Sequence, residues 1–270
     1  MRVALCQTNS AENVSANAAD VERLLNEAGA AGVDLAALPE VWPCQGSAPQ
    51  MRAAAEPVPG PRTELLASIA REHRMWVHGG SVLELDGDRV FNTSVLFDRD
   101  GDLVARYRKI HLFDADPPGA VPSRESFLFA AGDEVVAAAT EFGRAGMSIC
   151  YDVRFPELYR SLVVQGATIL FVPAAFRYET GEAHWDVLLR ARAIEDQCFV
   201  IAAAQWGSWG PHGRERRNFG NSMVVDPWGR VLARAVDGVG LTCVEIDLDE
   251  VRRVREIVPA LGHRRMRPTC

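Results

Sequence analysis

The sequence is 270 residues long, 48% of them hydrophobic, and it carries a formal net charge of −7 at pH 7. A chain of this size and composition can bury a full core, and its negative charge argues against a general nucleic-acid or membrane surface, because phosphate groups are bound by basic faces. No linker, repeat or low-complexity run divides the sequence, so we expect a single domain over residues 1–270.

The cysteines, the histidines and the start of the chain indicate the cellular setting. The sequence begins directly on a strand pattern without an apolar signal core, and no apolar run approaches the length of a membrane span. Its six cysteines form no C-x-x-C pair, and its six histidines show no metal-ligand spacing. We therefore expect a cytoplasmic protein with reduced thiols, no metal and no cofactor.

The first half of the chain alternates strands with helices. Hydrophobic periodicity predicts strand Arg2–Gln7, helix Asn13–Ala31, strand Asp34–Leu38, helix Thr63–His73, and strands Met75–Leu83, Val90–Phe97 and Leu103–Lys109. Pro39 and Pro43 end the third of these elements, because proline cannot donate to a strand ladder. A long loop, His111–Ala131, follows and contains Pro117–Gly119. Loops of this length inside a compact domain usually have a function.

The second half repeats the alternation and then adds hairpins. The patterns predict strand Gly146–Cys150, helix Pro156–Gln165, strand Thr168–Val172, helix Ala183–Gln197, and strands Phe199–Ala204, Met223–Val225, Val231–Ala235 and Leu241–Ile246. A Trp- and Gly-rich loop is expected over residues 205–220. This order predicts mixed sheets covered by helices, a layered α/β architecture, and leaves open one wide sheet or two packed sheets.

Three reactive side chains, Glu40, Lys109 and Cys150, stand at the carboxyl ends of predicted strands. In α/β sheets ligands bind at that edge, so the three could meet although they are far apart in sequence. A cysteine that attacks a carbonyl or nitrile carbon needs a base for its proton and a positive group for the charge that develops on the heteroatom. Glu40 can be the base and Lys109 the charge, with Cys150 exposed at the end of its strand.

The strings around these residues resemble the nitrilase (carbon–nitrogen hydrolase) superfamily and its Glu-Lys-Cys triad. They are Leu38–Glu40, Tyr107–Phe113 and Ile149–Glu157. The similarity runs almost end to end and is closest to the Nit branch of amidases, which Thr180–Trp185, Leu188–Glu195 and Ser222–Gly229 also resemble. It implies an αββα sandwich that forms a four-layer homodimer through helices, or a higher homo-oligomer.

The resemblance also implies roles for single residues. Glu40, Lys109 and Cys150 carry over as base, oxyanion stabiliser and nucleophile, and Glu125 matches an additional glutamate that positions the substrate or the lysine. Four further residues are expected to position the substrate: Tyr151, Arg154, Phe176 and Arg177.

The implied activity is that of an amidase. It would hydrolyse a small carboxylate-bearing amide, of the deaminated-glutathione or α-keto acid type, to an acid and ammonia through a cysteine thioester. An omega-amidase, a carbamoylase, a nitrilase of the same superfamily or a non-catalytic binding relative are alternatives. Nitrilases typically show Cys-Trp-Glu at the nucleophile, whereas this chain has Cys150-Tyr151-Asp152.

Two departures from the branch pattern bear on the substrate. The chain has Phe219-Gly220-Asn221-Ser222 where Tyr-Gly-His-Ser is usual, and Arg177 where a small or hydroxyl residue is commoner. Arginine binds carboxylates through a fork of paired donors, which predicts a carboxylate on the substrate. The candidates for this contact are Arg154, Arg177, Arg214, Arg216 and Arg217, and each could instead be solvated or paired with an acid.

Overall fold

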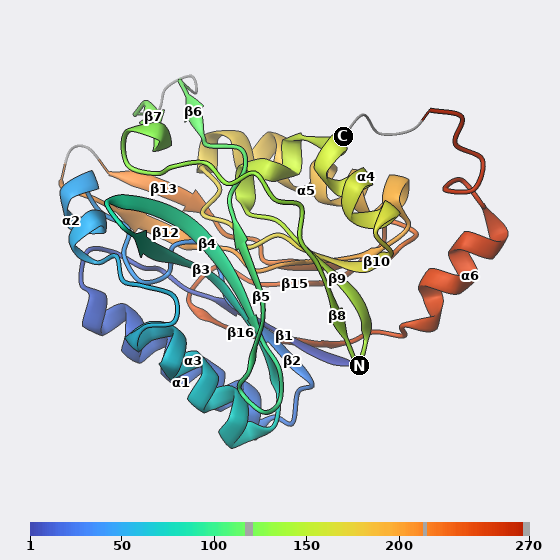
Figure 1. The fold of residues 1–270 in the computed structure, drawn as a ribbon, viewed down its shortest axis with the longest axis horizontal. Coiled ribbons are helices and arrows are strands. Elements are labelled where there is room, and N and C mark those ends of the chain that lie inside the picture. Colours follow the sequence, from blue (N-terminus) through green and yellow to red (C-terminus); the bar gives the residue numbers. More distant parts are fainter. Residues whose placement is uncertain (117–120, 213–214, 267–270) are drawn as a thin grey trace.

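Two mixed β-sheets pack face to face and are covered by helices on their outer faces (Figure 1). The computed structural model describes residues 1–116, 121–212 and 215–266. The predicted αββα sandwich is confirmed, and the choice between one wide sheet and two packed sheets is resolved in favour of two. Pro117–Gly119, Arg214 and Cys270 lie outside the described residues.

The first sheet has six strands in the order β16-β1-β2-β3-β4-β5. In chain order these are β1 (Arg2–Gln7), β2 (Leu35–Ala37), β3 (Trp76–Asp86), β4 (Arg89–Phe97), β5 (Leu103–Arg108) and β16 (Gly240–Glu245). β1, β2 and β3 are parallel, whereas β4, β5 and β16 join by antiparallel pairing. β5 therefore runs in the same direction as β2, and the two strands end at the same edge.

The second sheet has the order β15-β14-β11-β10-β9-β8. Its strands are β8 (Ala137–Thr140), β9 (Gly143–Met147), β10 (Ala167–Phe171), β11 (Phe199–Ala202), β14 (Met223–Val225) and β15 (Val231–Arg234). β9, β10 and β11 are parallel, and hairpin strands flank them on both sides. Two short pairs stand apart, β6 (Asp114–Ala115) with β7 (Ser123–Arg124) and β12 (Trp206–Trp209) with β13 (Arg216–Phe219).

The helices complete the outer layers. α1 (Val14–Ala30) and α3 (Pro61–His73) cover the first sheet, and α4 (Pro156–Val164) and α5 (Tyr178–Asp196) cover the second (Figure 1). The shorter α2 (Ala48–Ala53) and the C-terminal α6 (Asp249–Ile257) lie beside the sandwich. No helix of residues 1–116, 121–212 or 215–266 has the length and apolar character that crossing a bilayer requires.

Side-chain alternation explains how one strand joins two cores. Val3 and Leu5 of β1 face the second sheet, whereas Ala4 and Cys6 pack against the helices α1 and α3. All four are fully buried, which is why β1 reads as a continuous apolar run. Asn13 caps α1 by accepting a hydrogen bond from the backbone N–H of Ala16.

Several segments differ from the sequence-based expectation: β9 ends at Met147 rather than at Cys150, and the short α2 and β8 were not predicted. α5 starts at Tyr178, five residues before the predicted Ala183, and its first turns contain Gly181, where an added Cβ would overlap the side chain of Phe219. Residues 205–220 contain the hairpin β12–β13 rather than only a loop. The helix α6 was not predicted, because it has few apolar residues and buries only Val251 and Val254.

Gly80 allows β3 to approach the segment that carries Glu40. It lies at a break in the β3–β4 register, has φ +58, and a Cβ atom built on it would overlap the carbonyl oxygen of Pro39. Next to it, the Ser81 N–H donates to the Pro39 carbonyl at 3.1 Å and the Ser81 hydroxyl accepts from the Val41 N–H at 2.8 Å. The turn that holds Glu40 is therefore fixed on β3.

We expect Gly80→Ala to destabilise the protein more than Gly87→Ala. Both glycines have positive φ, which costs alanine about 1–2 kcal/mol, but a Cβ at Gly87 meets nothing within 4 Å. At Gly80 the overlap with Pro39 should add about 1–3 kcal/mol. Urea unfolding of both variants measures the difference, and equal losses of stability would contradict the close approach.

Candidate active site

A buried lysine lies between two carboxylates at the end of β5. Lys109 is 1% exposed, and its Nζ lies 2.8 Å from Oε1 of Glu40 and 2.9–3.0 Å from both carboxylate oxygens of Glu125. Glu125 begins the short 3₁₀ helix η1 (Glu125–Phe127) and accepts a further hydrogen bond from the Phe113 N–H at 2.8 Å. The cation is thus fully paired inside the protein.

The carboxylate of Glu40 is held by several donors besides Lys109. The side-chain amide of Asn92 on β4 donates to Oε1 at 2.9 Å, and the backbone N–H of Ala175 donates to Oε2 at 2.7 Å. Gln205 donates to the backbone carbonyl of Glu40 at 3.0 Å. These bonds fix the direction in which the carboxylate faces.

Cys150 occupies a tight turn rather than the exposed end of a strand. β9 ends at Met147, and Cys150 opens the 3₁₀ turn η2 (Cys150–Arg154) with φ +47. Its N–H donates to the Pro173 carbonyl at 2.9 Å, and the residue is only 8% exposed. The expectation of an exposed cysteine was wrong, because the turn continues past the strand end and directs the residue inward.

Asp152 joins this turn to the end of β5. Its Oδ2 accepts from the Ile149 N–H at 2.8 Å and the Tyr107 hydroxyl at 2.7 Å, and its Oδ1 accepts from the His111 N–H at 3.1 Å. The His111 ring nitrogen Nδ1 lies 2.7 Å from the same oxygen, and the ring stacks on Phe155. One fully buried carboxylate therefore sets the position of Cys150 relative to Lys109.

The electrostatics of the cluster keep the thiol protonated and the lysine charged. Burial and the neighbouring Glu40 raise the pKa of the Cys150 thiol well above its ordinary value, against the opposing effect of Lys109. Burial alone would lower the pKa of Lys109, but the carboxylates of Glu125 and Glu40 outweigh it and raise that pKa well above its usual range. Burial also raises the pKa of Glu125, and Lys109 opposes this shift.

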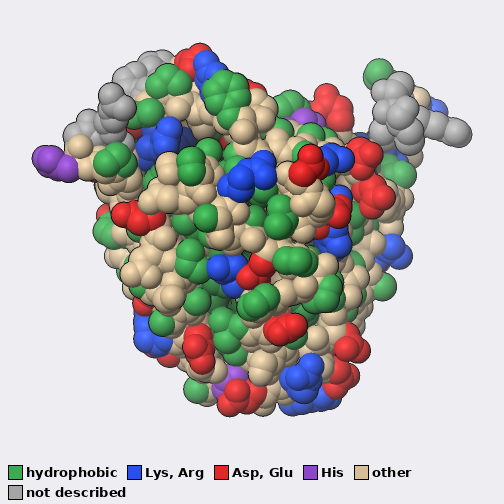
Figure 2. All heavy atoms as spheres, turned by 60° about the vertical axis from the view of Figure 1, so that its left-hand side comes forward, with side chains coloured by type: hydrophobic (Ala, Val, Ile, Leu, Met, Phe, Trp, Pro, Cys, Tyr) green, Lys and Arg blue, Asp and Glu red, His purple; other side chains and the backbone are tan. Residues whose placement is uncertain are grey.

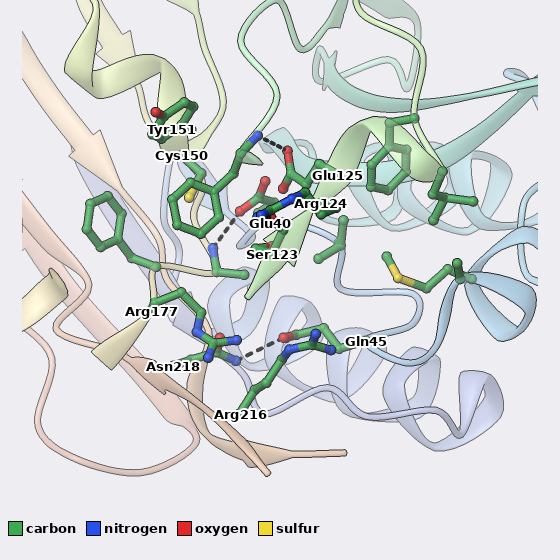
Figure 3. A pocket seen from close by; sticks show the side chains of 18 of the residues that line it. Glu40, Gln45, Ser123, Arg124, Glu125, Cys150, Tyr151, Arg177, Arg216 and Asn218 are labelled. Carbon is green, nitrogen blue, oxygen red and sulfur yellow. Dashed lines mark hydrogen bonds between the residues drawn. The ribbon is translucent and has the colours of Figure 1, made fainter. Parts of the chain in front are cut away.

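A cavity of about 510 Å³ opens onto this cluster (Figure 3). Its lining includes seven of the eight predicted site residues: Glu40, Glu125, Cys150, Tyr151, Arg154, Phe176 and Arg177. Lys109 is not among the lining residues, but its Nζ is bonded to both of the lining glutamates. The structure therefore brings all the predicted site residues to one place, while their catalytic and binding roles stay predictions.

The arginines predicted to meet a carboxylate are placed differently. Arg154, Arg177 and Arg216 line the cavity. The guanidinium of Arg217 instead lies 4.0 Å from the ring centroid of Tyr178, because adjacent residues of β13 face opposite sides.

Several supporting residues were not singled out from the sequence. Asp152 and His111 lie inside the strings that resemble the superfamily, but their local pattern could not reveal a bond across two sheets. Asn92 and Gln205 come from separate strands and loops, and only the fold brings them to Glu40. Within the described ranges no three His, Cys, Asp or Glu side chains gather as metal ligands would, and the absence of a metal stays a prediction.

Comparison with known proteins identifies the family. The carbon–nitrogen hydrolase family model matches residues 2–256. Deaminated glutathione amidase from Bos taurus is 42% identical over 270 residues, which covers 97% of this chain and 81% of the relative.

Solved structures agree with this match. The C. elegans NitFhit protein has a TM-score of 0.90 at 39% identity, and the match covers 98% of this chain and 65% of that protein. Saccharomyces cerevisiae Nit3, a member of branch 10 of the nitrilase superfamily, has a TM-score of 0.86 at 30% identity, with 98% and 97% of the two chains covered. The predicted membership and hydrolase class are confirmed, and the chain belongs to the carbon–nitrogen hydrolase family of the nitrilase superfamily.

Proposed function

We propose that this protein is an amidase that hydrolyses a small carboxylate-bearing amide, of the deaminated-glutathione or α-keto acid type, to an acid and ammonia. The observation that carries the proposal is the charged Lys109 beside Glu40, at the end of the cavity that Cys150 lines. The relatives named deaminated glutathione amidase support this substrate class.

The arrangement supports a thioester mechanism in two steps. In the first, the Cys150 sulfur bonds to the amide carbon while its proton passes to Glu40, and ammonia leaves with that proton as the C–N bond breaks. In the second, water attacks the thioester carbon and gives a proton to Glu40, which returns it to the sulfur as the acid leaves. We assign to the ammonium of Lys109, beside Glu40, the stabilisation of the negative oxygen that develops in both steps.

The raised pKa of Cys150 fits a base-assisted mechanism. A thiolate at rest would add a third negative charge beside Glu40 and Glu125, with one cation to balance them. The thiol therefore stays protonated until a substrate is bound. Glu40 is held by Lys109, Asn92 and Ala175 in a fixed direction, which suits the role of a proton acceptor at that moment.

The charges on one face of the molecule agree with a small-molecule substrate. On the face shown in Figure 2, acidic and basic side chains are interspersed among apolar ones, and neither sign forms a continuous patch. A nucleic acid would require a basic face. The cytoplasmic location and the absence of membrane partners stay predictions from composition.

We also propose that two copies join through the outer helices of the second sheet. Large apolar side chains are exposed there, namely Val187 and Ile194 on one face of α5, Val164 at the end of α4, and Trp228 in the β14–β15 turn. Such a face is typical of an interface between subunits.

Replacement of the proposed nucleophile tests the mechanism. We expect Cys150→Ser to lower kcat for ammonia release from glutaramate by at least about 10³-fold, because the activated nucleophile is lost. Mass spectrometry of the quenched wild type should find the acyl group on Cys150. Cys243→Ser is the control, because Cys243 is an exposed thiol on β16 and does not line the cavity. Full activity of Cys150→Ser would refute the mechanism.

Asp152→Asn tests whether the buried carboxylate positions the nucleophile. The amide cannot accept all the bonds that Asp152 accepts, so we expect kcat to fall about 10-fold or more, with about 1–3 kcal/mol of lost stability. Asp226→Asn is the matched control, because Asp226 is also buried and accepts from the Trp228 and Arg230 N–H groups in a turn. It should lose stability while kcat is kept; a similar fall in kcat for both variants would contradict a positioning role.

The dimer proposal predicts that a charge on the α5 face separates the subunits. Light scattering after size exclusion should give a dimeric mass for the wild type and a monomeric mass for Ile194→Asp. Val236→Asp, at an exposed apolar residue outside this face, should remain dimeric. A monomeric wild type would exclude the proposed interface.

A further inference from the structure

One side of the active-site cavity is polar and built from three separate segments (Figure 3). It consists of Gln45, Arg177, Trp209, Arg216 and Asn218, which we call the polar wall. Gln45 precedes α2, Arg177 precedes α5, and the other three belong to the β12–β13 hairpin. The rest of the lining includes the apolar residues Val41, Met51, Leu128 and Phe129.

Every member of the polar wall has a buried polar atom without a hydrogen-bond partner among the described residues. The five atoms are Gln45 Nε2, Arg177 Nε, Trp209 Nε1, Arg216 Nε and Asn218 Oδ1. Buried polar groups are nearly always satisfied, so five unsatisfied atoms in one wall indicate a place for a ligand. Four of the five are donors, which indicates a ligand rich in acceptors.

The positive charge of the polar wall also favours a ligand rich in acceptors. Arg177 is 7% exposed, and its Nε lies 3.6 Å from the nearest Glu179 oxygen, beyond hydrogen-bond distance. Arg216 donates to the Pro122 carbonyl at 3.3 Å and stacks over Trp209. Burial lowers the pKa of both arginines; the nearby Glu179 carboxylate opposes this shift at Arg177 but does not cancel it, and burial is the cause at Arg216.

The polar wall is connected to the catalytic cluster through short stretches of chain. Ala175, whose N–H donates to Glu40, is two residues before Arg177, and Phe176 between them lines the same cavity. Gln45 follows Glu40 by five residues, and its side chain accepts from Asn218 at 3.0 Å. A molecule bound at the polar wall therefore lies in the cavity that Cys150 faces.

We propose that the polar wall binds a carboxylate of the substrate that is separate from the scissile amide. This inference rests on the proposed amidase function and assigns its specificity to Arg177 and Arg216, with Gln45 Nε2 as a supporting donor and Asn218 holding the Gln45 side chain in place. A carboxylate offers two acceptor oxygens in one plane, which match the fork of a guanidinium. Amide substrates with an acid group at the far end of the chain are thereby selected over neutral amides of equal length.

The experiment compares glutaramate with pentanamide, which has the same chain length but no carboxylate. We expect the wild type to prefer glutaramate in kcat/KM, and we expect Arg177→Gln and Arg216→Gln each to reduce this preference at least about 10-fold, as loss of a charge-assisted contact predicts. Arg216→Lys keeps the positive charge but lacks the paired donors of the guanidinium. Its preference for glutaramate should therefore lie between those of the wild type and Arg216→Gln.

Arg217→Gln is the matched control. Arg217 is the neighbour of Arg216 on β13 but lies over Tyr178 outside the cavity lining. It should leave the preference unchanged. If Arg177→Gln and Arg216→Gln behave like Arg217→Gln while their melting temperatures stay near that of the wild type, the polar wall is only solvated and the inference is wrong.

A binding measurement separates this inference from the proposed function. Calorimetry with glutarate on the Cys150→Ser protein requires no turnover, and binding should weaken at least about 10-fold when Arg216→Gln is added. Glutarate binding without any amide hydrolysis by the wild type would support the polar wall and refute the amidase. Hydrolysis of both amides with equal efficiency, together with no glutarate binding, would support the amidase and refute the polar wall.

Discussion

The burial of one ammonium group between two carboxylates is the constraint on which the rest of the site depends. Lys109 is the cation nearest to Glu40 and Glu125, so any further negative charge in this place is costly. Removal of one partner from such a buried pair typically costs about 3–5 kcal/mol, because the remaining charge stays uncompensated. The three charged groups therefore have to come together as a unit. The negative charge of Glu40 and the burial of the site raise the pKa of the Cys150 thiol, so the thiol keeps its proton.

The two sheets contribute different parts of this unit. Glu40 and Lys109 follow strands of the first sheet, whereas Cys150 follows β9 of the second. The site exists only where the carboxyl ends of both sets of strands reach the same end of the sandwich. Its formation is thus tied to the sheet-to-sheet core, and the reactive residues add polar bonds at the rim of that core.

The proline-marked end of β2 was predictable from the sequence, whereas the end of β9, the turns and the cross-sheet contacts were not. Pro39 ends β2 by removing a ladder donor, so the place of Glu40 could be predicted. The inward direction of Cys150 could not, because it depends on a positive φ that a non-glycine residue adopts only when its surroundings hold it there. The bonds of Asp152 join groups some 40 residues apart in sequence, and no local pattern encodes them.

The carboxylate of Asp152 opposes movement of one sheet relative to the other. Tyr107 and His111 reach it from the first sheet and Ile149 from the second, so a sliding of one sheet against the other would break several bonds to a buried carboxylate at once. Small displacements of the sheets are therefore resisted at the place where they would separate the sulfur from the ammonium. Adjustment to different substrates by movement of one sheet against the other is accordingly opposed by the same bonds that align the reactive groups.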